Sequence, residues 1–563
     1  MTRQNTPEPP PTSQKWLQCN GQQLRKLAHA SMLWLDKNHR AVNELNVFPV
    51  PDGDTGTNML LTMRSAYGRI KDSDEIHVGK MAAALSQGAL MGARGNSGVI
   101  LSQIWRGLAR GLKDKETFNA DDLALAFQAA SDTAYNGVMR PVEGTILTVI
   151  REGAEEARDA AKKSQDLRFV MERILERCEQ VLERTPELLP VLKQAGVVDS
   201  GGKGLVYILE GMLRYTNGQM ATVVEELAQA QQAAHVPAQA LAMPEGGELE
   251  NPYDVQFILT GKNLDVNAVR DRIDAMGDST VVVGDETTIK VHIHVKDPGE
   301  PISYGISLGQ ITDVVVENMQ MQMEEIVHAP GATAVPQVVP ATVQPGQIGV
   351  VAVAAGDGLA NIFMSLGAAF IVNGGQTNNP STEEIFQAIQ DVPTDKVIIL
   401  PNNKNIILAA EAARDLSPKH VAVVTSKTAP QGFSAMMALN PDGELVETAA
   451  AMQEALGFVS TGEITRATRT VELDGVAVNE GEIIGVVDGS LCASGSDLTQ
   501  TIVDVLDKMA MDERELLSLY FGQDVSKEEA TAVAEQIESL YPDIEVEILP
   551  GGQAHYFYIL GAE

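Results

Sequence analysis

Two carboxylates stand two positions apart in a glycine-rich turn, within the segment NVFPVPDGDTGTN at residues 46–58. Asp52 and Asp54 can therefore converge on one side of the backbone. Paired hard oxygen ligands suit a magnesium ion that is bound together with nucleotide phosphates. The alternative is a turn whose acidic side chains only cap the helix that follows it.

Two other kinds of acidic motif fit this segment poorly. An EF-hand loop that starts at Asp52 needs an oxygen ligand at its fifth position and Glu at its twelfth, where the chain has Gly56 and Met63. A phosphatase of the haloacid dehalogenase type also uses a DxDxT motif, but at the end of a buried strand. Pro49 and Pro51 precede the aspartates, and proline cannot donate a hydrogen bond to a central strand ladder.

Three further polar loops separate helical patterns. In GARGNSG, residues 92–98, the glycines let main-chain N–H groups approach phosphate oxygens, and the following helix presents its positive end. No GK[ST] follows, so this loop is not a P-loop. The other two loops are PVEGT at 141–145 and DSGGKG at 199–204. Taken singly, each of the three is also an ordinary turn between helices.

A different kind of candidate lies in the strand-like stretch TIKVHIHV. His292 and His294 stand at i and i+2, so on a strand they share a face and both imidazoles can bind one metal ion. The alternative is a pair of histidines that face solvent.

Periodicity predicts the elements that must position these residues. Apolar residues recur at helical spacing from about Cys19 to Gly218, which indicates an all-α bundle that carries the four polar loops. Three strand patterns and one helical pattern between Tyr253 and Glu325 indicate a small α/β domain. From residue 347, repeated strand-turn-helix patterns such as IGVVAVAAGDGLANIFMSLG predict a mostly parallel sheet, followed by an antiparallel meander.

The expected organisation follows from these patterns and from two Pro- and Ala-rich stretches. We expect a disordered tail at 1–18, a helical domain at 19–220, a linker at 221–250, a middle domain at 251–326, a second linker at 327–346 and a C-terminal domain at 347–563.

Composition excludes several classes of function. The 563 residues include 76 Asp and Glu against 42 Lys and Arg, a formal charge of −34 that repels nucleic acid and anionic membrane surfaces. Three distant cysteines offer neither a disulfide framework nor a CxxC zinc module. The N-terminal residues have no apolar signal region, and no apolar run is long enough to span a bilayer, so we expect a cytoplasmic protein without membrane insertion.

The four loops, in this order, resemble the ATP-binding subunit of dihydroxyacetone kinase, whose family fold is an all-α barrel with magnesium ions held on the ATP phosphates. The longer forms NVFPVPDGDTGTN and GARGNSGVILSQ resemble the fatty acid kinase branch of that family. The resemblance continues through VVVGDETTIKVHIHVKDPG in the middle domain and through NPSTEEI, VIILPNNKNI and KTAPQGF in the C-terminal domain. It covers nearly all of the chain from residue 20, and it implies a multidomain protein with an N-terminal all-α helical barrel.

The resemblance also implies roles for individual residues. Asp52 and Asp54 become magnesium ligands, with Asn46 near the position of a third. Phosphate contacts fall to Thr55, Gly56, Asn58, Gly95, Asn96, Ser97 and Gly98, with Arg94 neutralising charge. The residues that would line the nucleotide site are Glu143, Gly144, Thr145, Asp199, Gly201 and Gly202. In the resembling family a Cys joins the two histidines on zinc; here the aligned residue is Asp254, which gives a candidate zinc site of Asp254, His292 and His294.

The implied reaction is phosphoryl transfer from ATP to a fatty acid carboxylate. The acid would be presented by a separate fatty-acid-binding protein of the DegV type, the product would be an acyl phosphate, and the C-terminal domain would dock the carrier. The family also implies a homodimer. We expect no large apolar pocket in the helical domain, because the lipid is carried elsewhere. The alternatives are a kinase of dihydroxyacetone or another small polyol, and a non-enzymatic nucleotide-sensing scaffold.

Overall fold

The computed structural model describes residues 14–47, 50, 53–138, 140–219, 253–261, 264–284, 288–318, 343–376 and 378–563. The chain divides into two compact units. One unit joins residues 1–220 with residues 337–563, and the other consists of residues 221–336. The N-terminal and C-terminal domains therefore pack together, although the middle domain separates them in sequence. The predicted tail and linkers fall mostly outside the described residues.

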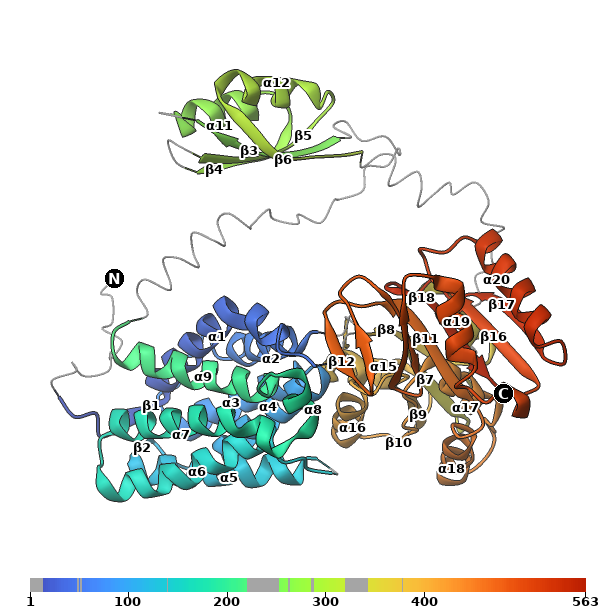
Figure 1. The fold of residues 1–563 in the computed structure, drawn as a ribbon. Helices are drawn as coiled ribbons and strands as arrows, with labels where there is room; N and C mark the ends of the chain where they lie inside the picture. Colours follow the sequence, from blue (N-terminus) through green and yellow to red (C-terminus); the bar gives the residue numbers. More distant parts are fainter. Residues whose placement is uncertain are drawn as a thin grey trace. The chain divides into compact units, whose positions relative to one another are not determined.

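Helices build the N-terminal domain (Figure 1), as predicted. They are α1 (Gly21–Asn43), α2 (Thr55–Gly68), α3 (Val78–Met91), α4 (Gly95–Gly111), α5 (Ala120–Asn136), α6 (Ile146–Lys163), α7 (Leu167–Leu188), α8 (Pro190–Ala195) and α9 (Ser200–Thr216), with a short antiparallel pair of β1 (Cys19–Asn20) and β2 (Thr117–Phe118).

One hydrophobic cluster fills the space between these helices. Leu35, Met63, Leu85 and Leu101 are fully buried in it, and burial of such side chains is the main favourable term in folding. Trp16 is also buried there, and its backbone N–H donates to Asp166 Oδ1 at 3.1 Å. The packed chain therefore begins before Cys19, the predicted start of the domain.

The middle domain is a small α/β unit, as predicted. Its elements are β3 (Tyr253–Thr260), α11 (Val266–Asp274), β4 (Asp278–Gly284), β5 (Thr288–Val295), α12 (Gly299–Leu308) and β6 (Gln310–Asn318). The four strands form an antiparallel sheet in the order β4-β5-β3-β6. Val255, Phe257, Val291 and Ile293 are buried in its core.

The C-terminal domain begins with the predicted parallel sheet, in the order β10-β9-β7-β8. Every residue of β7 is buried, which explains its continuous apolar sequence. This half comprises β7 (Ile348–Ala354), α14 (Asp357–Ser365), β8 (Phe370–Asn373), α15 (Thr382–Asp391), β9 (Lys396–Leu400), α16 (Ile407–Leu416), β10 (His420–Val423), α17 (Ala429–Met437) and α18 (Leu445–Ala455).

A second, six-stranded sheet completes this domain, in the order β15-β14-β11-β18-β16-β17. Its pairs are antiparallel except β16 with β17. The segment predicted as a meander is antiparallel but divided, because β12 and β13 pair in a sheet of their own while β14 and β15 pair in the six-stranded sheet. This half comprises β11 (Ser460–Arg466), the hairpin β12 (Val471–Leu473) and β13 (Val476–Val478), β14 (Ile483–Val487), β15 (Ser490–Gly495), α19 (Leu498–Leu506), a 3-10 turn (Met511–Glu513), β16 (Leu516–Phe521), α20 (Lys527–Leu540), β17 (Glu545–Pro550) and β18 (Tyr556–Ala562).

Two apolar contacts join the helical and C-terminal domains. Ala93 and Val99, at the start of α4, are buried against the parallel sheet and its helices α15 and α16. Val50, in the aspartate-rich loop, is buried against the β12–β13 hairpin and β14. Figure 1 shows α16 and β12 on the side of the C-terminal domain that faces the helices. The C-terminal domain thus covers two of the four loops that carry the candidate chemistry.

Candidate nucleotide and metal site

Asp54 occupies the N-cap position of α2 but does not cap it. Asn43, at the end of α1, takes that role: its Oδ1 accepts from the N–H groups of Gly56 at 2.7 Å and Thr57 at 3.2 Å. Its Nδ2 also donates to Thr57 Oγ1 at 3.0 Å. The capping alternative is therefore wrong for Asp54, whose side chain makes no capping hydrogen bond to α2.

The starts of four helices gather at one end of the helical domain. At the start of α2, Thr55 Oγ1 lies 3.4 Å from Ser200 Oγ at the start of α9. The N–H of Ile146, which begins α6, hydrogen-bonds Asp199. The starts of α2 and α4 also touch, through Asn58 and Gly95. Each helix start carries a partial positive charge, a property that suits anionic phosphates.

Glycine is required at two predicted positions in these loops. Gly95 has φ of 58°, and a Cβ there would lie 2.5 Å from Asn58 Nδ2. A Cβ on Gly56 would lie 2.1 Å from the His39 carbonyl oxygen, so this glycine lets α2 approach α1. Gly95 thus lets the first turn of α4 lie against Asn58, and Gly56 serves the packing of α2 against α1.

Asp199 caps α9, since its Oδ2 accepts from the Gly202 N–H at 2.6 Å. Although the residue is partly exposed, desolvation of its carboxyl group raises the pKa to about 6, against the hydrogen bonds from Gly202 and Ile146. Gly201 and Gly202 lie in the first turn of the same helix.

Glu143 is held by side chains of α5 and α6, the helices on either side of its loop. Tyr135 Oη donates to it at 3.0 Å, Thr148 Oγ1 at 2.8 Å and Arg151 Nη1 at 2.5 Å. Burial opposes ionisation, but these hydrogen bonds together lower the pKa of Glu143. Gly144 adopts φ of 82° beside it, and Thr145 caps α6. The loop is therefore rigidly shaped, while its predicted contact with a nucleotide stays a prediction.

The remaining predicted residues are spread around these helix starts. Asp52 lies outside the described residues. Asn46 lines a groove that the aspartate-rich loop shares with Thr468 and Arg469 of the C-terminal domain. Ser97 and Gly98 belong to the first turn of α4, and Asn96 Nδ2 lies 3.5 Å from Asn405 Oδ1.

Arg94 lies against the C-terminal domain. Its Nη1 donates to the Asn379 carbonyl at 2.8 Å and lies 3.1 Å from Glu384 Oε2. Asn379 also donates through Nδ2 to Asp54 Oδ2. Sequence reasoning missed both asparagines, Asn43 and Asn379. The resemblance flagged NPSTEEI as a family segment, but nothing in its residues pointed to a partner 325 positions away.

Three family models match the chain. They describe the C-terminal domain of FakA-like fatty acid kinase proteins over residues 349–563, the DAK2 domain over 49–214 and the FakA-like middle domain over 250–326. Protein YloV of Bacillus subtilis is 40% identical over 552 residues, which cover 97% of this chain and 99% of the relative. The chain belongs to the FakA-like fatty acid kinase family.

An uncharacterized protein of Staphylococcus aureus, SAR1202, is 37% identical over 94% of the chain and 96% of its own length. Among solved structures, a fatty-acid-binding DegV family protein from Thermus thermophilus covers 38% of the chain at 13% identity and a TM-score of 0.30, with 99% of its own chain matched. The Streptococcus pneumoniae Fatty Acid Kinase (Fak) B3 protein, loaded with linoleic acid, covers 33% at 11% identity and a TM-score of 0.25, with 76% of its own chain matched. Both structural likenesses are weak.

The residues of this family member fit a magnesium-bound nucleotide. Asp54 makes no capping hydrogen bond, the starts of α2 and α4 meet at Gly95, and the buried Asn379 Oδ1 has no hydrogen-bond partner among the described residues. An oxygen ligand, the starts of helices and an unsatisfied buried acceptor suit such a ligand.

The candidate zinc site can be followed only along the backbone. Asp254 pairs with His294 across β3 and β5, and His292 pairs with Gln256. The side chains of Asp254, His292 and His294 lie outside what the structure describes. Among the side chains that it does describe, no group of three His, Cys, Asp or Glu residues is arranged to hold a metal ion.

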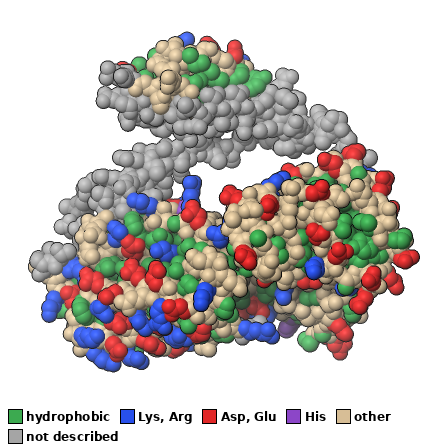
Figure 2. Space-filling model, in the orientation of Figure 1, with side chains coloured by type: hydrophobic (Ala, Val, Ile, Leu, Met, Phe, Trp, Pro, Cys, Tyr) green, Lys and Arg blue, Asp and Glu red, His purple; other side chains and the backbone are tan. Residues whose placement is uncertain are grey.

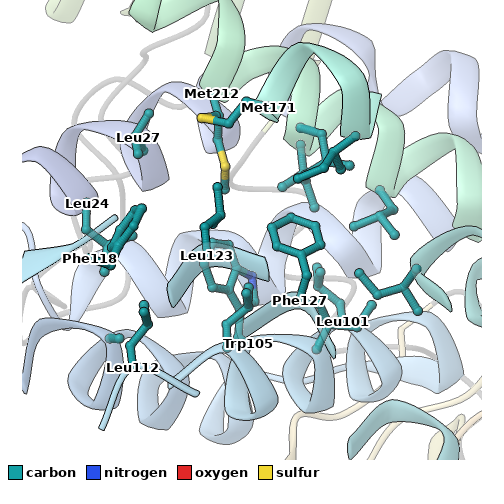
Figure 3. Close-up of a pocket in the computed structure, with 18 residues that line it drawn as sticks. Leu24, Leu27, Leu101, Trp105, Leu112, Phe118, Leu123, Phe127, Met171 and Met212 are labelled. Atoms are coloured by element: carbon teal, nitrogen blue, oxygen red, sulfur yellow. The ribbon is translucent and has the colours of Figure 1, made fainter. Parts of the chain in front are cut away.

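A small apolar cavity lies inside the helical domain. Figure 3 shows Trp105, Leu123, Phe127, Met171 and Met212 around it, and all 18 lining residues are apolar. Its volume is about 60 Å³. That is room for about five water-sized groups, less than a long acyl chain needs. No helix among the described residues is long and apolar enough to cross a bilayer.

Proposed function

We propose that the protein transfers the γ-phosphoryl group of ATP to the carboxylate of a fatty acid, giving an acyl phosphate. The acid is presented by a separate fatty-acid-binding protein of the DegV type. The observation that carries the proposal is the position of Asp54: a carboxylate that does not cap its helix, where four helix starts meet. Family membership supports the choice of reaction.

The chemistry fits the residues present. A fatty acid carboxylate has a pKa of about 4–5 and is already ionised at neutral pH, so no general base is needed. One carboxylate oxygen forms a bond to the γ-phosphorus, and the bond from that phosphorus to the bridging oxygen of ADP breaks with both electrons leaving on ADP. The barrier is the approach of two anions, which calls for positioning and neutralisation of charge.

The chain's own groups supply the positioning. Asp54, with Asp52, holds the metal; the first-turn N–H groups of α4 bind phosphate oxygens. When bound, ATP would supply the phosphoryl group and magnesium would shield its charge. The cavity of about 60 Å³ in the helical domain supports a lipid that is carried by another protein. Docking of that carrier falls to residues 347–563 in this proposal.

The deciding experiment incubates the protein with ATP, magnesium, a fatty acid and a candidate carrier, then traps acyl phosphate with hydroxylamine. A hydroxamate that requires both ATP and carrier is the expected result. Parallel reactions replace the acid and carrier with free dihydroxyacetone or glycerol. ATP turnover on either polyol without a carrier would identify a polyol kinase instead, and no turnover on any acceptor would favour a nucleotide-sensing scaffold.

A further inference from the structure

Asn379 belongs to the C-terminal domain but lies in the candidate kinase site. It sits between β8 and α15 and is 2% exposed. Its Nδ2 donates to Oδ2 of Asp54, at the start of α2 in the helical domain. A side chain this deeply buried, hydrogen-bonded to the carboxylate of a metal loop, fixes the direction in which that carboxylate points.

The backbone around Asn379 is fastened to the loop before α4. The Asn379 carbonyl accepts from Arg94 Nη1 at 2.8 Å, and the Thr382 N–H donates to the Ala93 carbonyl at 3.1 Å. Glu384 pairs with Arg94 at 3.1 Å while it completes the capping box of α15 with Ser381. Several polar contacts and the buried Ala93 therefore set the position of Asn379.

The contact from Asn379 reaches Asp54 from outside α2. Asn43 already satisfies the first N–H groups of α2, and the Asp54 side chain makes no capping hydrogen bond there. The Oδ1 atom of Asn379 is buried and has no hydrogen-bond partner among the described residues. An unsatisfied buried acceptor of this kind costs stability until a donor or a hydrated cation arrives.

We propose that Asn379 is a positioning residue for the magnesium-binding carboxylate of Asp54, so that the metal site is complete only with the C-terminal domain in place. This inference rests on the proposed function for the identity of the ligand. It extends that function by assigning part of the nucleotide site to the C-terminal domain, in which the sequence predicted no nucleotide-binding or metal-binding residue.

The test compares two alanine variants of the full-length chain. Asn379→Ala removes the contact with Asp54. Asn378→Ala makes the same chemical change one position earlier, where the side chain is exposed. Binding of a non-hydrolysable ATP analogue is measured by calorimetry over a range of magnesium concentrations. Loss of a residue that orients a metal ligand typically costs about 10–100-fold in metal affinity. Asn379→Ala should therefore need about 10–100-fold more magnesium for half-maximal binding, and Asn378→Ala should match the wild type.

A melting experiment separates positioning from simple loss of folding. Without ligand, Asn379→Ala should melt close to the wild type, but the rise in melting temperature that magnesium and the analogue produce should shrink. Equal magnesium dependence in wild type and Asn379→Ala would overturn the inference. So would an equal loss in Asn378→Ala. Neither readout needs a fatty acid or a carrier, so failure of the acyl phosphate assay leaves this test intact.

Discussion

Asn43 and Asp54 divide two tasks that one acidic residue often combines at the start of a helix. The amide of Asn43 satisfies the N–H groups of Gly56 and Thr57, while the Asp54 carboxylate is contacted by Asn379. Stability and metal binding should therefore respond to different substitutions in this loop.

We expect Asp54→Asn to abolish turnover and to leave the free energy of unfolding near that of the wild type. Loss of an electrostatic group of this kind typically costs about 10²–10³ in rate. Asn43→Ala should instead destabilise the protein by about 1 kcal/mol, as loss of a cap does. Urea unfolding and an ATP turnover assay on both variants check the division. Asp54→Asn with a tenth or more of wild-type activity would contradict the metal role.

The carboxyl group of Asp199 leads to a prediction of how the stability of the protein depends on pH. Its folded pKa of about 6 lies above the ordinary value of 3.8, because burial disfavours the charged form. Between these values the folded chain keeps a proton that the unfolded chain has released, so stability falls as pH rises through the window. Asp199→Asn retains a capping acceptor and does not titrate. Relative to this variant, the wild type should lose roughly 1–2 kcal/mol between about pH 4 and 6, measured by urea unfolding. Parallel curves for the two proteins would contradict the assignment.

At the scale of elements, sequence patterns predicted which segments are helices and strands, because each signal is local. The apolar run of β7 and the four polar loops between helices are examples. The patterns could not show that the loops meet, since Thr55 and Ser200 are 145 positions apart and their contact depends on packing of α2 against α9. The contact of Asn379 with Asp54 depends further on two domains docking, which no local spacing encodes.

The β3–β5 pair carries the zinc prediction. The register of this pair places Asp254 of β3 opposite His294 of β5. His292 lies two positions before His294 on β5. Residues so placed can share one tetrahedral ion with a water as the fourth ligand. Purified protein should hold about one zinc per chain by elemental analysis, and His292→Ala should lose it. His420→Ala, at an exposed histidine of β10, is the control. The zinc prediction would be contradicted if the wild-type chain contained no zinc and a chelator did not change its melting temperature. The two histidines would then be ordinary surface residues.

Over the whole molecule, the negative charge is concentrated in the C-terminal domain, where residues 347–563 hold 10 Lys and Arg against 32 Asp and Glu. On the face shown in Figure 2, Lys and Arg side chains gather mainly on the helical domain. A carrier that docks on the C-terminal domain should therefore present a basic face, and its association should weaken with ionic strength. Carrier titrations at low and high salt check this. An apparent affinity that does not change with salt would move docking away from the acidic domain.

Removing the C-terminal domain separates two accounts of its role. If the domain only tethers the carrier, a chain that ends at Gln344 should bind magnesium and ATP normally, and excess carrier should restore acid phosphorylation, because a tether supplies only effective concentration. If the domain also completes the site, the truncated chain loses Asn379 from Asp54 and exposes Val50, Ala93 and Val99.

The contacts favour the second account. The truncated chain should therefore need at least about tenfold more magnesium to bind ATP, and excess carrier should not restore its rate. Calorimetry with the ATP analogue and carrier titration of both chains measure the two effects, with circular dichroism confirming that the helices remain folded. If the truncated chain bound the nucleotide normally and excess carrier fully restored its rate, the C-terminal domain would act only as a tether for the carrier. Because Asn379→Ala alters the same contact in the intact chain, its magnesium dependence should shift in the same direction as that of the truncation, with the carrier affinity unchanged.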